Sequence, residues 1–432
     1  MASDYSAARQ EFVDRINAEV STNIPFIQKR VNYGKDAINK NTRSNGVIHL
    51  YVPAGGTGDV EELSDADGIK SGALDRTDDT GKANASYYEV KCYARNGWEL
   101  FSHSALEDMF QIGDIDKNIL EGRKISLTQN INKDLVSRNW TIANGACVAG
   151  SDEIGFVAMN KAISILEVIK ASGSWTGFMS PMFKSKLGTE SAKKNGGFDV
   201  PDEIMREMYG RKGIGRYADT DWVNEAFMPE FTTGALNTTD TASGITVKTD
   251  VSTQGATEIT ITGFTASGTI KKGTPFTVEG VYDVTMGAGL PIAEKKVFIV
   301  QADASSVADS DKYKYTLKVL PMYFNDRTKG YQNNLYNADS KIPAEAEVKG
   351  LCAASTTYYT CLIKEDRSFN WTPFTLPDVD GCKNTTTSTD DLTIQLVSGG
   401  DLLKRYNSMR FDSPYFGDIV DPRANRLVYY KK

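Results

Sequence analysis

Apolar residues near the start of the chain recur at the spacing of a helix. They fall every four residues on one face of a helix over about residues 5–20: Ala8, Phe12, Ile16 and Val20. Pro25 follows this stretch and ends the pattern. A single amphipathic helix has no core of its own, so we expect this one to dock on another surface.

The longest helical pattern covers about residues 114–143. Such a helix would have about 30 residues, far more than the average of about 11–12. At 1.5 Å per residue it would be roughly 45 Å long. Its spacing is not a regular heptad and is confined to one helix, which favours a spine across a domain over a coiled coil. The apolar face consists of Ile112, Ile115, Ile119, Leu127, Ile131, Leu135 and Ile142.

Two further helices are predicted from the pattern. One covers about residues 152–171, where Ala158, Ala162 and Ile165 recur in register. Asp152 precedes it and is a suitable N-cap residue. A shorter helix is predicted near residues 202–209.

Two predicted strands flank a long polar segment. Residues 47–52 and 87–93 have strand character, and the acidic, Gly-rich stretch between them is longer than a compact domain usually tolerates as a loop. The pattern predicts an extended hairpin. Its outer part is either a disordered surface loop or an arm that is ordered only against a neighbouring subunit. The acidic residues of the stretch are Asp59, Glu61, Glu62, Asp65, Asp67, Asp75, Asp78 and Asp79.

The amino-acid composition changes at about Thr232. From there to about Asp311 the chain is rich in Thr, Gly and Val, and short strands alternate with Gly-containing turns. This spacing is typical of a small β-barrel or sandwich. Mixed structure returns from about Ala344, so we predict an all-β domain inserted into an α+β body. We expect the inserted domain, about residues 234–343, to fold on its own.

Composition narrows the class of protein. The chain has 432 residues, 40% of them hydrophobic, which is enough for two or three domains. Its formal net charge of -7 argues against a protein that binds nucleic acid through bulk charge. Five cysteines without a CxxC pair argue against a disulfide framework or a cysteine zinc site. We find no signal-peptide or transmembrane pattern and expect synthesis in a cytoplasm.

Candidate catalytic chemistry is sparse. His49 and His103 are the only histidines, and neither belongs to an HExxH or GxSxG context, so we predict no metal site, cofactor or catalytic residue. The segment Gly210–Tyr217 resembles a phosphate loop in its glycines and basic residues, but it lacks GxxxxGK[ST]. A mobile basic surface loop is the better interpretation, and the same residues are candidates for contact with an acidic surface on a neighbour.

Four stretches carry a resemblance to a known family. They are Asp240–Val247, Gly268–Val281, Asn333–Asp339 and the Pro377-Asp-Val tripeptide. Together with the order of elements, they resemble the coat proteins of Salmonella-type short-tailed phages. These proteins have the Hong Kong 97-type capsid fold with an inserted β-barrel. The likeness in element order spans nearly the whole chain. One departure is the stretch 249–257, which is short where the family's best-known member has a long loop between capsomers.

The resemblance implies a division of the chain into six parts within an α+β fold. These are an N-terminal arm (1–44), an extended loop hairpin (45–95), a peripheral domain with the spine helix (96–172), the first part of an axial domain (173–233), the inserted β-barrel (234–343), and the second part of the axial domain with return strands (344–432).

The resemblance further implies a major capsid protein of a tailed bacteriophage, a virion protein and not an enzyme. Its expected partners are copies of itself in hexamers and pentamers, a scaffolding protein and a portal. It would enclose packaged DNA without sequence-specific binding and would contact no membrane. The candidate subunit contacts are Phe12, Ile16, Glu61, Glu62, Asp65, Asp67, Arg76, Arg211, Lys212 and Arg216.

Two other classes stay open on the sequence alone. The Thr- and Gly-rich β region also suits a tail component or a carbohydrate-binding adhesin. A hydrolase with an accessory β-domain is the third interpretation, although no pair of carboxylates stands out as its acid and base. The size of the purified particle separates these classes, because a capsid protein forms rings or shells.

Overall fold

The structure is a computed structural model of the whole chain. It describes residues 2–432 except for thirteen segments. The segments outside it are residues 29, 31–46, 54–62, 65–67, 70–86, 105–114, 151–154, 171–172, 194–214, 239–243, 287–289, 326–334 and 402–405, together with residue 1.

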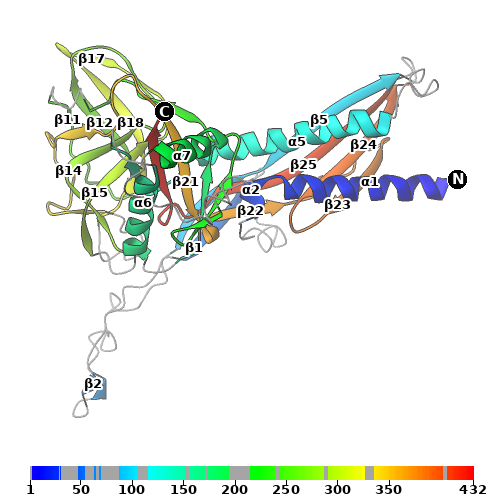
Figure 1. Cartoon of the computed structure of the whole chain (residues 1–432), viewed down its shortest axis with the longest axis horizontal. Helices are drawn as coiled ribbons and strands as arrows, with labels where there is room; N and C mark the ends of the chain where they lie inside the picture. Colours follow the sequence, from blue (N-terminus) through cyan, green and yellow to red (C-terminus); the bar gives the residue numbers. More distant parts are fainter. Residues whose placement is uncertain are drawn as a thin grey trace.

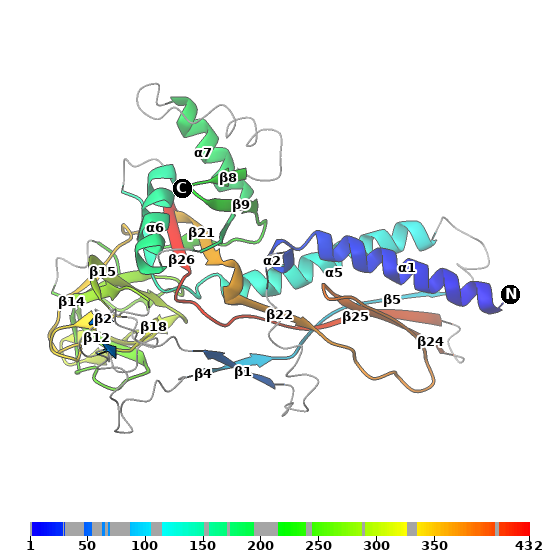
Figure 2. The ribbon, with the colours of Figure 1, turned by 90° about the horizontal axis from the view of Figure 1, so that it is seen from below.

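An elongated arm extends from one side of the molecule (Figure 1). Its framework is a five-stranded antiparallel sheet in which the long strand β25 pairs with β5 along one edge and with β24 and β22 along the other. Helices α1 (Ala2–Thr22) and α5 (Ile115–Asn139) cover one face of this sheet (Figure 2). The strands are β5 (Arg95–Ser104), β22 (Phe369–Pro373), β23 (Lys383–Ser388), β24 (Thr393–Asp401) and β25 (Tyr406–Ile419).

The predicted N-terminal helix exists and docks on its own chain. Val13, Ile16 and Val20 of α1 are buried in the same hydrophobic core as α5 and β24. Asn17 lies on this face too, where its amide donates to the carbonyl of Leu392 at 2.8 Å. The buried positions therefore follow a spacing of three and four residues. The short helix α2 (Pro25–Gln28) comes next and extends the same core.

The predicted spine helix is also present, but it ends earlier than expected. Leu127, Ile131 and Leu135 form its buried face, as the pattern indicated. The predicted end near residue 143 is wrong, because α5 stops at Asn139. The Asn139 side chain donates to the carbonyl of Leu135 at 2.9 Å, which satisfies a terminal carbonyl group and lets the chain turn.

A seven-stranded mixed sheet forms the centre of the molecule, flanked by α6 (Gly155–Lys170) and α7 (Pro181–Lys193). The predicted face of α6, with Ala158, Ala162 and Ile165, is buried against the sheet. The strands are β6 (Ala146–Val148), β7 (Trp175–Met179), β8 (Gly215–Tyr217), β9 (Thr220–Asn224), β10 (Glu230–Thr232), β21 (Thr357–Glu365) and β26 (Arg426–Lys431). The predicted N-cap Asp152 and the helix near 202–209 lie outside the described residues.

Between β10 and β21, which pair with each other, the chain forms an eight-stranded sheet with a separate hydrophobic core. The predicted strands of this region are present. They are β11 (Thr246–Val247), β12 (Ala256–Phe264), β14 (Pro275–Val284), β15 (Pro291–Val300), β17 (Val307–Asp309), β18 (Lys312–Tyr323), β19 (Tyr336–Asn337) and β20 (Val348–Gly350). A small ribbon of β13 (Thr269–Ile270) and β16 (Ala304–Ser305) lies beside it.

The predicted pairing at the base of the long hairpin is also confirmed. Strands β1 (Val47–Pro53) and β4 (Tyr87–Tyr93) are antiparallel partners. Ile48 and Leu50 pack with Phe416 of β25, so the base of this hairpin lies on the arm of its own chain. A second small pairing joins β2 (Leu63–Ser64) and β3 (Gly68–Ile69) farther along the hairpin.

Candidate assembly surfaces and buried ion clusters

The outer face of the arm carries exposed apolar side chains. Along β5, alternate residues point to opposite sides of the sheet. Glu99 faces α5, where it accepts hydrogen bonds from Ser126 and, at 2.8 Å, from Asn130. Trp98 and Leu100 face the other side and are 53% and 51% exposed. The helices therefore cover one face of the sheet and leave these two side chains open to a partner.

The edge of the arm adds to this surface. Among the described residues, β5 pairs only with β25, so its second edge has unused backbone donors and acceptors. The Arg410 guanidinium lies 5.2 Å from the centre of the Trp98 ring and binds Asp412 at 2.7 Å. These contacts hold Trp98 against the sheet without covering it.

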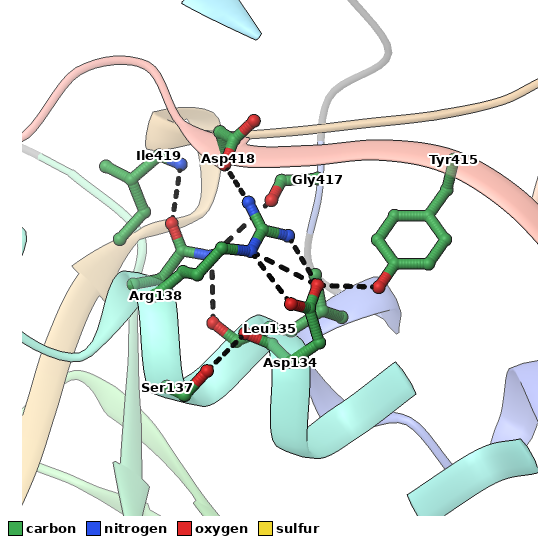
Figure 3. A network of polar contacts seen from close by, with 9 residues as sticks. Asp134, Leu135, Ser137, Arg138, Tyr415, Gly417, Asp418 and Ile419 are labelled. Atoms are coloured by element: carbon green, nitrogen blue, oxygen red, sulfur yellow. Dashed lines mark hydrogen bonds and ion pairs between the residues drawn. The ribbon is translucent and has the colours of Figure 1, made fainter. Parts of the chain in front are cut away.

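A partly buried ion cluster fixes the end of α5 to β25 (Figure 3). Arg138 binds Asp134 on its own helix at 2.8 Å and also binds Asp418 of β25. The Tyr415 hydroxyl donates to Asp134 at 2.7 Å. Burial raises the pKa of Asp418, and the charge of Arg138 opposes that rise. One cation thus serves two carboxylates, and both side chains of the Arg138–Asp418 pair retain some contact with solvent.

A second ion cluster is fully buried where the eight-stranded sheet meets the body. Lys296 of β15 donates to Asp283 of β14 and to the side-chain oxygen of Asn144, both at 2.8 Å. Arg426 of β26 binds the other oxygen of Asp283 at 3.1 Å. Here two basic side chains share one carboxylate.

Close packing surrounds this junction. Gly273 has a φ of +90°, and a Cβ atom there would lie 2.2 Å from the Trp140 ring. The main-chain oxygen of Gly273 also accepts a hydrogen bond from Tyr429. Gln301 donates to the carbonyl of Thr141 at 3.1 Å. The sheet is therefore held firmly against the segment that follows α5.

A third buried group is a carboxyl that has no cation partner among the described residues. Glu225, at the end of β9, is fully buried and accepts from Asn132 of α5 at 2.9 Å and from the Phe227 backbone at 3.1 Å. Its second oxygen has no hydrogen-bond partner in the part of the chain that the structure describes. Burial raises the pKa of Glu225 to about 7, and the two hydrogen bonds oppose that rise.

Two cavities in the described part of the chain do not resemble a catalytic site. One of about 660 Å³ is lined partly by Lys161, Lys295 and Lys349. Two of these cations are neutralised, because Lys295 binds Glu279 at 2.5 Å and Lys349 binds Glu347 at 3.2 Å. A second cavity, of about 460 Å³, lies between α5 and β5 beside Trp98.

Metal and thiol chemistry find little support in the described residues. They contain no group of three or more His, Cys, Asp or Glu side chains arranged around a common point. All five cysteines are unbridged, and burial raises the pKa of Cys92, Cys352 and Cys361, which suppresses their reactive thiolate form. None of the described helices has the length and apolar character needed to cross a membrane.

The structure places a minority of the contact residues predicted from the sequence. Ile16 is buried in the core of its own chain, so it is covered in this conformation. Arg216 lies on β8, is exposed and binds Asp219 at 3.1 Å. The other candidates fall outside the described residues or, for Phe12, have an undescribed side chain: Glu61, Glu62, Asp65, Asp67, Arg76, Arg211 and Lys212. The side chains of His49 and His103 are likewise undescribed.

Sequence reasoning missed the buried ion cluster and the exposed pair on β5. A signal for the first existed, because Lys296 directly precedes the apolar run Val297–Val300, all of it buried. A charged residue at the start of such a run is a candidate for burial with a partner. Trp98 carried no comparable signal, since a tryptophan in a strand is usually a core residue.

Comparisons with known proteins complete the description. No family model matches the sequence, and no match is found among curated proteins. Among solved structures, the fold is similar to the capsid of a native GTA particle, with a TM-score of 0.43, 8% identity and coverage of 95% of this chain and 91% of that one. It is also similar to the capsid of Ralstonia phage GP4, with a TM-score of 0.42, 8% identity and coverage of 90% and 85%. A structure of Mycobacterium phage Che8 is similar as well, with a TM-score of 0.40, 8% identity and coverage of 93% of this chain and 90% of that one. With TM-scores below 0.5, these likenesses carry no inference about function.

Proposed function

We propose that this chain is the major capsid protein of a tailed bacteriophage and assembles into the icosahedral shell that encloses double-stranded DNA. The observation that carries the proposal is the arm. Helix α5 lies along a long antiparallel sheet that extends away from the central α/β body (Figure 1). A chain of this shape presents contact surfaces far apart, which a closed shell built from one subunit requires.

The order of elements supports the Hong Kong 97-type assignment. A leading helix, a long hairpin, a spine helix, a mixed α/β unit, a β-rich unit and a set of return strands follow one another along the chain. This is the order expected from the sequence resemblance. We accordingly propose that residues 96–172 belong to a peripheral domain, that 173–233 and 344–432 form an axial domain, and that 234–343 are the inserted barrel.

The proposed contacts between subunits combine an apolar patch with charged segments. Trp98 and Leu100 supply exposed apolar area on an edge strand, a type of surface that readily joins another molecule. The acidic stretch within residues 45–95 and the basic residues Arg211, Lys212 and Arg216 are complementary in sign. Since Ile16 is covered by its own chain, the leading helix contributes less to these contacts than the sequence indicated.

The proposed partners are further copies in hexamers and pentamers, a scaffolding protein and a portal, with localisation in the virion after synthesis in the bacterial cytoplasm. DNA would be enclosed without sequence-specific binding, in keeping with the net charge of -7. The alternative of another virion or surface protein rests on the same β-rich unit. The hydrolase alternative has weaker support, since the buried Glu225 lines neither of the two cavities described above.

The test is the size and shape of the purified full-length protein, measured by mass photometry and electron microscopy, alone and with a co-expressed scaffolding partner. We expect rings or megadalton shells. The double variant Trp98→Ser/Leu100→Ser should stay small, whereas Val307→Ser, which removes an equally exposed residue from the eight-stranded sheet, should still assemble. A wild-type protein that remains a compact monomer under every assembly condition would overturn the proposal.

A further inference from the structure

The fully buried ion cluster contains the parts of a chemical reaction. Lys296 and Asp283 are 0% exposed and Asn144 is 4% exposed. The Lys296 amino nitrogen lies 2.8 Å from the Asn144 side-chain oxygen and 2.8 Å from a carboxylate oxygen of Asp283. An amine, a primary amide and a carboxylate are thus held together in a site that excludes water, an arrangement that favours reaction between them.

The charges at the site favour a neutral amine. Arg426 keeps its charge in proteins and occupies the second oxygen of Asp283 at 3.1 Å. A second buried cation beside the same carboxylate is unfavourable. Burial lowers the pKa of Lys296, Asp283 opposes this fall without cancelling it, and Arg426 lowers the pKa further. An uncharged lysine has a lone pair on its nitrogen and is a nucleophile.

We propose that Lys296 and Asn144 form an intramolecular isopeptide bond. The Nζ atom of Lys296 attacks the side-chain carbonyl carbon of Asn144 and forms a new C–N bond. The bond from that carbon to the Asn144 amide nitrogen breaks, and the nitrogen leaves as ammonia. Atoms balance without an oxidant or reductant, because one amine and one primary amide become one secondary amide and one ammonia. This inference does not depend on the proposed function.

Asp283 carries the proton between the two nitrogens. Its carboxylate accepts a proton from Lys296 as the new bond forms and returns it to the departing nitrogen. Two contacts hold it in place, the ion pair with Arg426 and a hydrogen bond from the Val284 backbone at 3.2 Å. The main-chain nitrogen of Asn144 donates to Asn425 at 3.0 Å, which fixes the amide on the other side.

The bond would join distant parts of the fold. Asn144 follows the spine helix α5, whereas Lys296 belongs to β15 of the eight-stranded sheet, 152 positions later. The covalent link would prevent the sheet from separating from the body. Its value to the protein is mechanical, and the loop that it closes in the unfolded chain is long.

The test is mass spectrometry of the full-length protein after complete unfolding. The bond removes ammonia, so the intact mass should be about 17 Da below the value expected from the sequence. A tryptic digest should contain one branched peptide that joins the segment around Asn144 to the segment around Lys296, with no cleavage after Lys296.

One competing reaction has the same mass. Gly145 follows Asn144, and an Asn-Gly pair can lose ammonia by closing on its own backbone. Lys296→Met separates the two reactions, because it abolishes the isopeptide bond and leaves the local ring closure possible. Lys295→Met, at the neighbouring exposed position, is the matched control and should keep the branched peptide. Asp283→Asn should greatly reduce the branched peptide.

Three results would overturn the proposal. They are a wild-type protein at the full sequence mass, a digest without the branched peptide, and a mass deficit that persists in Lys296→Met. The first two need no variant, so a variant that fails to fold does not prevent a decision.

Discussion

The Arg138 cluster of the arm and the Lys296 cluster at the base of the eight-stranded sheet differ in burial and in charge balance. In the Arg138 cluster one cation binds two carboxylates, and the side chains of Arg138 and Asp418 are about one-fifth exposed. In the Lys296 cluster two basic side chains bind one carboxylate, and the side chains of Lys296 and Asp283 are not exposed at all. The first cluster joins two elements of the arm, and the second joins the eight-stranded sheet to the body.

The difference shows where each cluster can tolerate a change. A partly exposed group that loses its partner can turn toward water, so the cost of the loss is limited. A fully buried charge cannot do so, and the loss of its partner costs the desolvation free energy of the whole group. We therefore expect a change in the fully buried Lys296 cluster to reduce the free energy of unfolding more than a change in the partly exposed Arg138 cluster.

Removal of the shared carboxylate should have the largest effect. Asp283→Ala leaves the buried Arg426 without its anion and Lys296 without its carboxylate partner, and it removes the group that we propose to carry the proton. We expect the free energy of unfolding to fall by about 3–5 kcal/mol, as for other broken buried pairs. Urea unfolding followed by tryptophan fluorescence measures this loss, and Trp140 beside Gly273 reports on the junction. Glu279→Gln is the exposed control, and an equal loss in both variants would contradict the ranking.

A buried carboxyl with no cation should respond to pH. Because the pKa of Glu225 is raised from 4.5 to about 7, the folded protein keeps a proton there that the unfolded chain has lost. Stability should therefore fall as the pH rises from 4.5 to 7, by on the order of 3 kcal/mol, and stay at the lower level above that window. Glu225→Gln mimics the protonated form, so it should remove this pH dependence and stabilise the protein at pH 8.

Urea unfolding at pH 5 and pH 8 tests the prediction for Glu225. Glu294→Gln, a change at an exposed position, should retain the wild-type difference between the two pH values. If Glu225→Gln were less stable than the wild type at pH 8, the buried group would have to be ionised and favourably bound, contrary to its surroundings.

Loss of the cation in the arm should cost less than loss of the Asp283 carboxylate. Arg138→Ala leaves Asp134 with its hydrogen bond from Tyr415 and leaves Asp418 with about one-fifth of its side chain exposed. We expect a loss of about 1–3 kcal/mol, since hydrogen bonds to charged groups have this magnitude. Arg138→Lys should recover part of it, because lysine restores the charge but cannot bind both carboxylates with a planar fork. Thermal unfolding of the three proteins measures the order.

The hydrophobic pattern was sufficient for most of the individual elements. Spacing located α1, α5, α6 and the pairing of β1 with β4, because each buries one continuous face and periodicity records such faces directly. It failed at the end of α5. Ile142 continues the apolar pattern there, but the hydrogen bonds of Asn139 to Leu135 and Ile419 end the helix.

Long-range polar contacts could not be predicted in the same way. The Lys296 cluster joins residues from the segment after α5, from two strands of one sheet and from a strand of another, and no local spacing relates these positions.

The contacts between the eight-stranded sheet and the body also bear on the expectation that residues 234–343 fold alone. Val297 and Ile299 of β15 lie in the core of the body, so an isolated fragment would expose them. Dispersed amide signals from such a fragment would show that this exposure is tolerated.

The smallest effect should come from the residue next to Lys296. Lys295 lies one position earlier on β15 and binds Glu279 at 2.5 Å, with both side chains well exposed. The hydrogen bond from Lys295 lowers the pKa of Glu279, so this contribution is present near neutral pH and is lost as the pH falls through that lowered value. Lys295→Met should reduce the free energy of unfolding by less than about 1 kcal/mol, and added salt should reduce the difference further. Urea unfolding at low and high salt provides the measurement. Lys296→Met changes the same residue type in the same way one position along the strand. If it reduced the free energy of unfolding by the same amount as Lys295→Met, burial would not control the strength of these contacts.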